Sequence, residues 1–264
     1  MARELFLVLI VLELIHLLTL VVDSEPQVPC YFLFGDSLVD SGNNNGFRTA
    51  AKANYPPYGI DFPQGVSGRF TNGRTYADII GQFLGFPNFI PPYATVTTGV
   101  NYGSASASAG IREESGSHLT LYKLGARKIA VFGLAHIGCT PTVVTRFDTE
   151  GKPCIESVND AVTRFNDGLK PLVDGLNRDN SEARFTFINF TSILELQGGA
   201  PLPNFPCCQV REDGQCIPNS IPCPIRASSI FFDGLHPMAI ATRPYNALSP
   251  MDASPYDINH LAQL

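Results

Sequence analysis

Hydrophobic and polar positions divide the chain after residue 28 into short apolar runs separated by amphipathic stretches. Continuous apolar runs bounded by turn residues are typical of strands covered on both faces of a parallel sheet. Such runs occupy residues 31–34, 94–102, 128–134 and 184–190. We expect each of the four to form a strand.

Between these runs, apolar residues recur at helical spacing. Residues 75–85 place Tyr76, Ile80 and Phe83 on one face, and residues 155–177 repeat apolar positions at intervals of three and four. This alternation of strands and helices predicts an α/β fold with one open sheet. After residue 197 the chain is rich in Pro, Gly and Cys, which predicts loops joined by disulfides and a short helix near the end.

The first 24 residues differ from the rest. Leu5 to Val22 is almost wholly apolar, interrupted by Glu13 and His16, and Arg3 precedes it. A central carboxylate is unfavourable in a membrane span, and the position at the N-terminus favours a secretory signal peptide over an uncleaved anchor. We therefore expect secretion, with residues 1–24 as the signal and no stable membrane insertion.

All seven cysteines follow that segment, and in an exported chain they predict disulfides rather than zinc ligands. The odd number leaves at least one thiol outside an intramolecular pair, and Cys139 with Cys154 is a plausible pair around a short loop. Asn189-Phe190-Thr191 is a glycosylation sequon. A net charge of −6 without a basic cluster argues against nucleic acid as a partner.

Candidate chemistry lies at two distant places. Ser37 directly follows the first apolar run, in "FGDSLVD", and ligands of open α/β sheets bind beyond the carboxyl ends of strands. A serine nucleophile needs a base and an acid that orients it, and "FFDGLHP" supplies Asp233 and His236. The spacing alone is weak evidence, because Asp257 and His260 repeat it near the C-terminus.

In combination the motifs carry more weight. "FGDSLVD", "NYGSASASAGI", "GARKIAVFGLAHIGCTP" and "FFDGLHP", in this order, resemble the plant GDSL esterase/lipase family of the SGNH hydrolases. The resemblance implies a flavodoxin-like three-layer α/β fold with parallel strands, covering residues 28–264. It also implies ester hydrolysis through an acyl-enzyme, with side chains and backbone alone and no cofactor.

The resemblance assigns roles to particular residues. Ser37 matches the nucleophile, His236 the general base and Asp233 its orienting partner, whereas His260 falls in the ordinary C-terminal tail. The oxyanion hole would use the backbone N–H of Ser37 and of Gly110, with Gly103 as the alternative glycine, and an Asn side chain from a third block.

That third block, a G-x-N-D motif after a central strand, is absent from the sequence. Asn159 precedes an Asp but lacks the Gly and lies in the long helical pattern, so we do not expect a catalytic role for it. Residues 111–127 are barely long enough for a crossover and cannot supply a strand as well. We therefore expect a sheet that lacks one central strand. Either the strand at 128–134 pairs with that at 31–34, or a gap separates them.

The sequence thus predicts a secreted esterase or lipase acting on small-molecule or lipid acyl esters, impaired by the missing oxyanion Asn. The alternative is a catalytically inactive family member that binds acyl groups or glycans.

Overall fold

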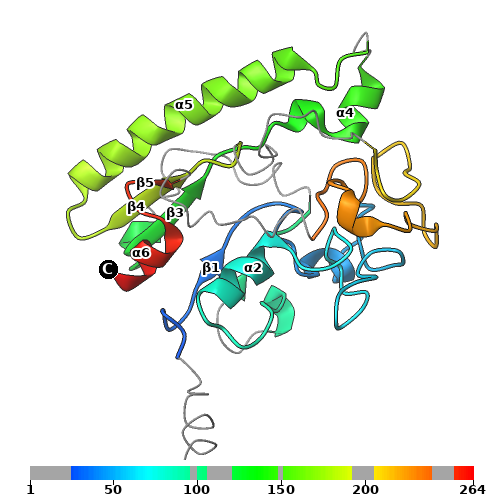
Figure 1. The fold of residues 1–264 in the computed structure, drawn as a ribbon. Helices are drawn as coiled ribbons and strands as arrows, with labels where there is room; N and C mark the ends of the chain where they lie inside the picture. Colours follow the sequence, from blue (N-terminus) through cyan, green and yellow to red (C-terminus); the bar gives the residue numbers. More distant parts are fainter. Residues whose placement is uncertain (1–24, 96–99, 106–120, 148–150, 192–204, 240–252) are drawn as a thin grey trace, which may run out of the picture.

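The computed structural model describes residues 25–95, 100–105, 121–147, 151–191, 205–239 and 253–264 (Figure 1). The strands are β1 (Phe32–Leu33), β2 (Val100–Asn101), β3 (Lys128–Phe132), β4 (Arg184–Ile188) and β5 (Ala253–Ser254). The helices are α2 (Tyr76–Phe83), α4 (Pro141–Arg146), α5 (Glu156–Asp179) and α6 (Ile258–Gln263). The short 3₁₀ turns are η1 (Asn43–Gly46), η2 (Tyr93–Thr95), η4 (Ile137–Cys139) and η6 (Arg226–Ser228). All four expected strands, both expected helices and the short helix near the end are confirmed.

The strands form two sheets rather than the expected single one. β1 pairs in parallel with β2, and β3 pairs in parallel with β4 over five residues, from Lys128 opposite Arg184 to Phe132 opposite Ile188. The expected parallel pairing is present between β3 and β4, and β5 adds an antiparallel strand on the free edge of β4. Sequence patterning missed β5 because its two residues, Ala253 and Ser254, are small and lie in no apolar run.

Of the two alternatives for the missing strand, the described residues show the gap. β3 pairs with β4 and not with β1, which has β2 as its strand partner. Phe32 in β1 and Phe34 just after it are 56% and 50% exposed, although a central parallel strand is normally covered on both faces. The crossover before β3 thus does not carry that strand over to β1.

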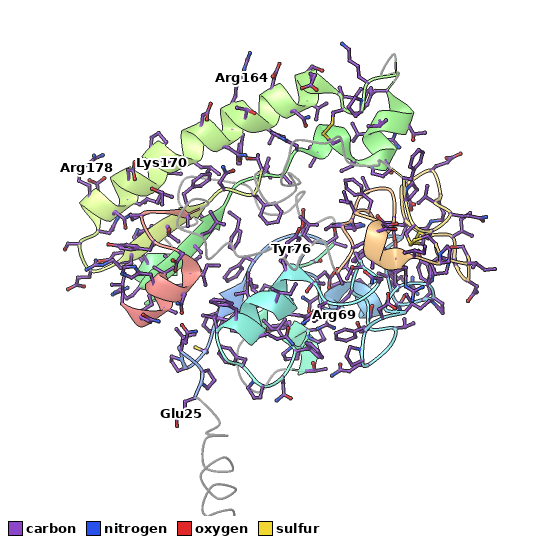
Figure 2. The ribbon with its side chains drawn as sticks, in the orientation of Figure 1. Glu25, Arg69, Tyr76, Arg164, Lys170 and Arg178 are labelled. Atoms are coloured by element: carbon purple, nitrogen blue, oxygen red, sulfur yellow. A yellow bond between two sulfur atoms is a disulfide. The ribbon has the colours of Figure 1, made fainter. Side chains whose placement is uncertain are left out.

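Helix α5 covers one face of the β3–β4–β5 sheet (Figure 1). Ile129 and Val131 of β3 and Phe185 and Phe187 of β4 pack against Val173 and its neighbours on the helix. Two buried or half-buried asparagines fasten the helix to strand ends: Asn166 bonds both N–H and C=O of Leu134, and Asn177 bonds those of Phe185. The charged side chains of Arg164, Lys170 and Arg178 on α5 are exposed (Figure 2).

The opposite face is covered by α2 and α6. Ile188 at the end of β4 packs with Tyr76 and Ile80 of α2 and Ile258 of α6. Half-buried residues around β1, including Tyr31 and Val39, join the same cluster, so α2 connects the two sheets. Helix, sheet and helix form the three layers that the sequence predicted.

Helix α2 starts at a well-defined position. The side chain of Thr75 and the carboxylate of Asp78 form a capping box at its N-terminus. Arg69 binds both oxygens of Asp78 at 2.7 Å, and both side chains are almost completely buried. The loop that precedes the helix is thereby fixed against its first turn.

Three disulfides join the described loops: Cys139–Cys154, Cys207–Cys223 and Cys208–Cys216. The pair expected around the short loop before α5 is confirmed, and the cysteine cluster of residues 207–223 forms disulfides as expected. Cys30 is free and exposed. Within the described residues, no helix is long and apolar enough to cross a membrane; the apolar segment 5–22 lies outside them.

Candidate active site

Ser37 lies in a tight turn directly after β1. The carboxylate of Asp36 accepts the N–H of Leu38 at 2.9 Å, and its backbone carbonyl accepts that of Val39. The N–H of Ser37 has no acceptor among the described residues, and its side chain is half-buried. The turn therefore presents both the hydroxyl and the backbone N–H of one residue.

The polar run after Ser37 fixes this turn to the neighbouring strand. Asp40 is fully buried and accepts the N–H groups of Gly42, Asn43 and Ala105. The amide of Asn43 donates to the carbonyls of Asn101 and Gly103. Burial raises the pKa of Asp40 above its ordinary value, although the three N–H groups that it accepts act to lower it. The segment after the serine is therefore an ordered scaffold and not a loose loop.

Asp233 and His236 share a compact turn. Oδ1 of Asp233 accepts the N–H of Leu235 at 2.8 Å and that of His236 at 2.7 Å. Gly234 between them donates to the carbonyl of Gly214, and a Cβ at this position would lie 2.0 Å from Oγ1 of Thr142. A larger residue would be crowded here, because the turn packs against Thr142 of α4 and the backbone of Gly214.

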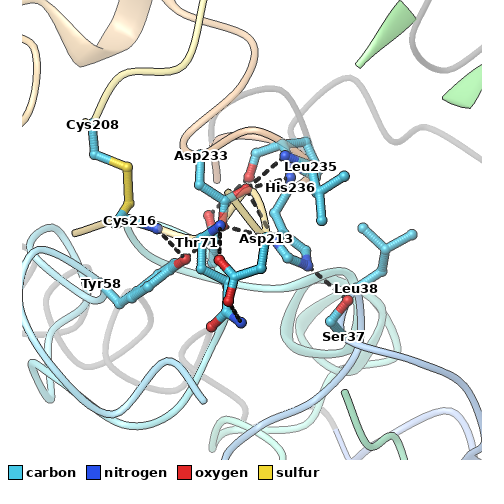
Figure 3. Close-up of polar contacts among 12 residues, drawn as sticks. Ser37, Leu38, Tyr58, Thr71, Cys208, Asp213, Cys216, Asp233, Leu235 and His236 are labelled. Carbon is cyan, nitrogen blue, oxygen red and sulfur yellow. Dashed lines mark hydrogen bonds and ion pairs between the residues drawn. A yellow bond between two sulfur atoms is a disulfide. The ribbon is translucent and has the colours of Figure 1, made fainter. Parts of the chain in front are cut away.

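The turn brings His236 to Ser37, 199 residues away in the sequence (Figure 3). Nδ1 of His236 lies 2.7 and 2.9 Å from the two oxygens of Asp233, and Nε2 lies 2.7 Å from Oγ of Ser37. Asp233 is 0% and His236 5% exposed. The three side chains sequence reasoning selected are thus in direct contact, in the order acid, imidazole, hydroxyl.

Burial and neighbouring charges have opposite effects on the pKa of His236. Burial disfavours its charged form, but the charge of Asp233 and its hydrogen bond outweigh this, together with the charge of Asp36, so that the pKa of His236 lies above its ordinary value. The ring also packs on Phe70, with centroids 5.0 Å apart. Such an arrangement can take a proton from Ser37 and stabilise the imidazolium that results.

Comparisons with known proteins agree with this geometry. Residues 111–242 match the profile of the GDSL-like lipase/acylhydrolase family. One GDSL esterase/lipase of Arabidopsis thaliana is 36% identical over 92% of this chain and 94% of its own length. A second from the same plant is 32% identical over the whole of both chains.

This chain belongs to the GDSL esterase/lipase family. Membership places it among the carboxylic ester hydrolases.

The alignments also show how this family member differs from its relatives. The alignment with the second relative spans 365 positions and takes in all of both chains, whereas this chain has 264 residues. About 100 positions of that relative therefore have no counterpart here. Their place in the chain, which the sequence predicts at 111–127, stays a prediction.

The glycine expected in the oxyanion hole lies outside the described residues, since Gly110 falls in 106–120. The alternative, Gly103, is described, and its N–H donates to Oδ1 of Asn101 at 2.7 Å. The N–H groups of Tyr102, Ser104 and Ala105 are also donated within the protein. Residues 102–105 thus present no spare backbone donor to a substrate.

Asn159 and His260, for which no catalytic role was expected, make their contacts away from the three candidate side chains. Asn159 lies in α5, where its side chain accepts the N–H of Gly138 and donates to the sulfur of Cys139. His260 is exposed on α6, and Asp257 caps that helix. His136 is half-buried beside η4, and His118 lies outside the described residues.

One residue of the site was missed by sequence reasoning. Tyr58 is 1% exposed, and its hydroxyl donates to Oδ2 of Asp233 at 2.6 Å. Nothing in its local sequence, "YPPYGIDFP", distinguishes it from Tyr55. Its contact with the acid joins residues 175 positions apart, and only the folded chain reveals it.

Proposed function

We propose that this chain hydrolyses small-molecule or lipid acyl esters through an acyl-enzyme on Ser37. Oγ of Ser37 attacks the ester carbonyl while its proton passes to Nε2 of His236, and Asp233 holds the imidazolium. His236 then gives the proton to the departing alcohol. A water molecule, deprotonated by His236, releases the acid and restores Ser37.

The observation that carries the proposal is the unbroken series of contacts from Asp233 through His236 to Ser37. Each contact is of hydrogen-bond length, at 2.7 Å. The names of the relatives, each a GDSL esterase/lipase, agree with this chemistry.

The oxyanion hole distinguishes this chain from a complete enzyme. We assign the N–H groups of Ser37 and Gly110 as its donors, and the free N–H of Ser37 supports the first of these. The sequence lacks the G-x-N-D block that would supply the third donor. Loss of one donor lowers turnover by roughly 10²–10³-fold. We therefore expect a slow esterase.

Hydrolysis of a p-nitrophenyl acyl ester tests the proposal, with the purified protein beside its Ser37→Ala variant. The variant keeps the backbone N–H and loses only the nucleophile, so kcat/KM should fall at least about 100-fold. Thermal melts by circular dichroism control for folding of both proteins. Equal rates for two folded proteins would contradict the proposal and favour an inactive acyl- or glycan-binding protein.

We also propose that the protein is secreted after removal of residues 1–24. Three disulfides fit an oxidising compartment, and the sequon at Asn189 fits glycosylation there. Sequencing the N-terminus of the protein exported from plant cells is the test. We expect the exported protein to begin between Ser24 and Val28. An exported protein that still contains the apolar segment beginning at Leu5 would contradict cleavage.

A further inference from the structure

The hydroxyl of Tyr58 makes two hydrogen bonds in the interior of the protein (Figure 3). It donates to Oδ2 of Asp233 at 2.6 Å and accepts the N–H of Cys216 at 3.0 Å. Cys216 is held in turn by its disulfide to Cys208. The phenol therefore links a covalently fixed loop to the acid of the candidate triad.

The two oxygens of Asp233 are held by different parts of the chain. Oδ1 accepts the N–H groups of Leu235 and His236, which belong to its own turn. Oδ2 is the oxygen closer to Nδ1 of His236, at 2.7 against 2.9 Å, and its other partner is Tyr58. The turn fixes one oxygen by itself, and a distant residue fixes the one that best meets the imidazole.

The ring of Tyr58 has little freedom to move. It meets Phe70 and Phe232 in edge-on contacts, with centroids 6.0 and 5.5 Å away. Burial and the charge of Asp233 raise the pKa of Tyr58 far above its ordinary value. The phenol thus keeps its proton across the working range of an esterase and remains a donor to Asp233.

We propose that Tyr58 is a positioning residue for ester hydrolysis, holding the carboxylate of Asp233 in the orientation that directs His236 toward Ser37. This inference rests on the function proposed above. Tyr58 touches neither Ser37 nor a substrate in this role; it acts through the acid.

A change at Tyr58 should have an electrostatic signature as well as a kinetic one. Without the phenol, Oδ2 keeps more negative charge for the imidazole, while Oδ1 remains held by two N–H groups. Because a stronger negative partner favours the imidazolium, the pKa of His236 should rise further. The charge of Asp36 also acts on His236 and is unchanged by the substitution.

The sign for catalysis follows from the role of His236 as a base. Only the neutral imidazole accepts the proton of Ser37, so activity is lost as pH falls through the pKa of His236. In the wild type, kcat/KM should decline on the acid side with a midpoint above the ordinary histidine value of about 6.5. In Tyr58→Phe this midpoint should lie higher, by roughly half a pH unit.

The experiment compares Tyr58→Phe with Tyr55→Phe in the full chain, using p-nitrophenyl ester hydrolysis between pH 5 and 9. Tyr55 is a matched control, because its hydroxyl donates to the carbonyl of the same Cys216 at 3.0 Å. We expect Tyr58→Phe to lower kcat/KM at neutral pH about tenfold and to shift the acid limb. In Tyr55→Phe, kcat/KM should stay within about twofold of the wild-type value, and the acid limb of the pH profile should not shift.

A second variant covers the case in which Tyr58→Phe does not fold. Site-specific replacement of Tyr58 by 3-fluorotyrosine keeps the hydroxyl and makes it a stronger donor. The acid limb should then move in the opposite direction, to lower pH. The positioning role would be overturned if the acid limb of the pH profile moved neither in Tyr58→Phe nor with 3-fluorotyrosine at position 58. It would also be overturned if Tyr55→Phe moved the acid limb by the same amount.

Histidine titration by NMR separates this inference from the proposed function. With labelled histidine, the His236 signal is assigned by its loss in His236→Gln, and its pKa is read without any substrate. If the wild-type protein showed no Ser37-dependent hydrolysis, this result would contradict the proposed esterase activity. A His236 pKa that is the same in Tyr58→Phe and wild type would contradict the role of Tyr58, whatever the activity.

Discussion

Two turns of this protein have the same sequence pattern, Asp-x-x-His, and the same local hydrogen bond. In each, Oδ1 of the aspartate accepts the backbone N–H of the histidine three residues later, at 2.7 Å. At Asp233 the histidine ring turns back onto the carboxylate and is buried against Ser37. At Asp257 the turn starts α6, and the ring of His260 is exposed beside Tyr256.

The difference teaches that this spacing makes a turn and not a catalytic pair. Aspartate is a preferred N-cap because its oxygen satisfies a backbone N–H, and both turns use it in that way. Three contacts from distant residues make the turn at Asp233 a candidate site. Tyr58 donates to Oδ2 of Asp233, Phe70 packs on the ring of His236, and Ser37 contacts Nε2 of that ring.

Exchanging each histidine for glutamine should separate the two turns most strongly. His236→Gln removes the proton acceptor of Ser37, and we expect kcat/KM to fall on the order of 10³-fold. His260→Gln introduces a better helix former on an exposed face and should leave the rate within about twofold. Ester hydrolysis by both purified variants is the measurement. Similar losses in the two would mean that the turns had been assigned wrongly.

Exchanging each aspartate for asparagine should sharpen the comparison with a smaller loss. In Asp233→Asn the amide donates a proton where Tyr58 and Nδ1 of His236 also donate, so His236 takes the wrong tautomer. We expect kcat/KM to fall roughly 10²-fold. In Asp257→Asn the cap is retained, because asparagine caps helices as well as aspartate does, and both rate and melting temperature should stay near wild type. An active Asp233→Asn would show that His236 works without an oriented tautomer.

Local patterns could predict much of this molecule. The four strands and helices α2 and α5 follow from runs and spacings of apolar residues, because side-chain burial has the period of the element that carries it. The pair Cys139–Cys154 closes a short loop, which a reader of the sequence can propose. Recurring motifs added Ser37, Asp233 and His236.

Other features depend on contacts that no local pattern encodes. The antiparallel strand β5 consists of Ala253 and Ser254, which lie in no apolar run, and it exists because the edge of β4 offers it hydrogen bonds. The length of the crossover left two alternatives, a pairing of β1 with β3 or a gap between them. The sequence could not decide between the two, and the structure shows no pairing of β1 with β3. Tyr58 and Tyr55 look alike in sequence, and only Tyr58 reaches the acid.

The sequence by itself determined four of the five described strands, helices α2, α5 and α6, the turn at Asp233 and the identity of the three candidate side chains. It could do so because these depend on interactions between residues a few positions apart, or on motifs read in order. Only the tertiary structure showed the contact of His236 with Ser37, what holds the second oxygen of Asp233, and where the sheet breaks. Those outcomes depend on contacts across 175 to 199 residues, whose geometry is set by the packing of the whole chain.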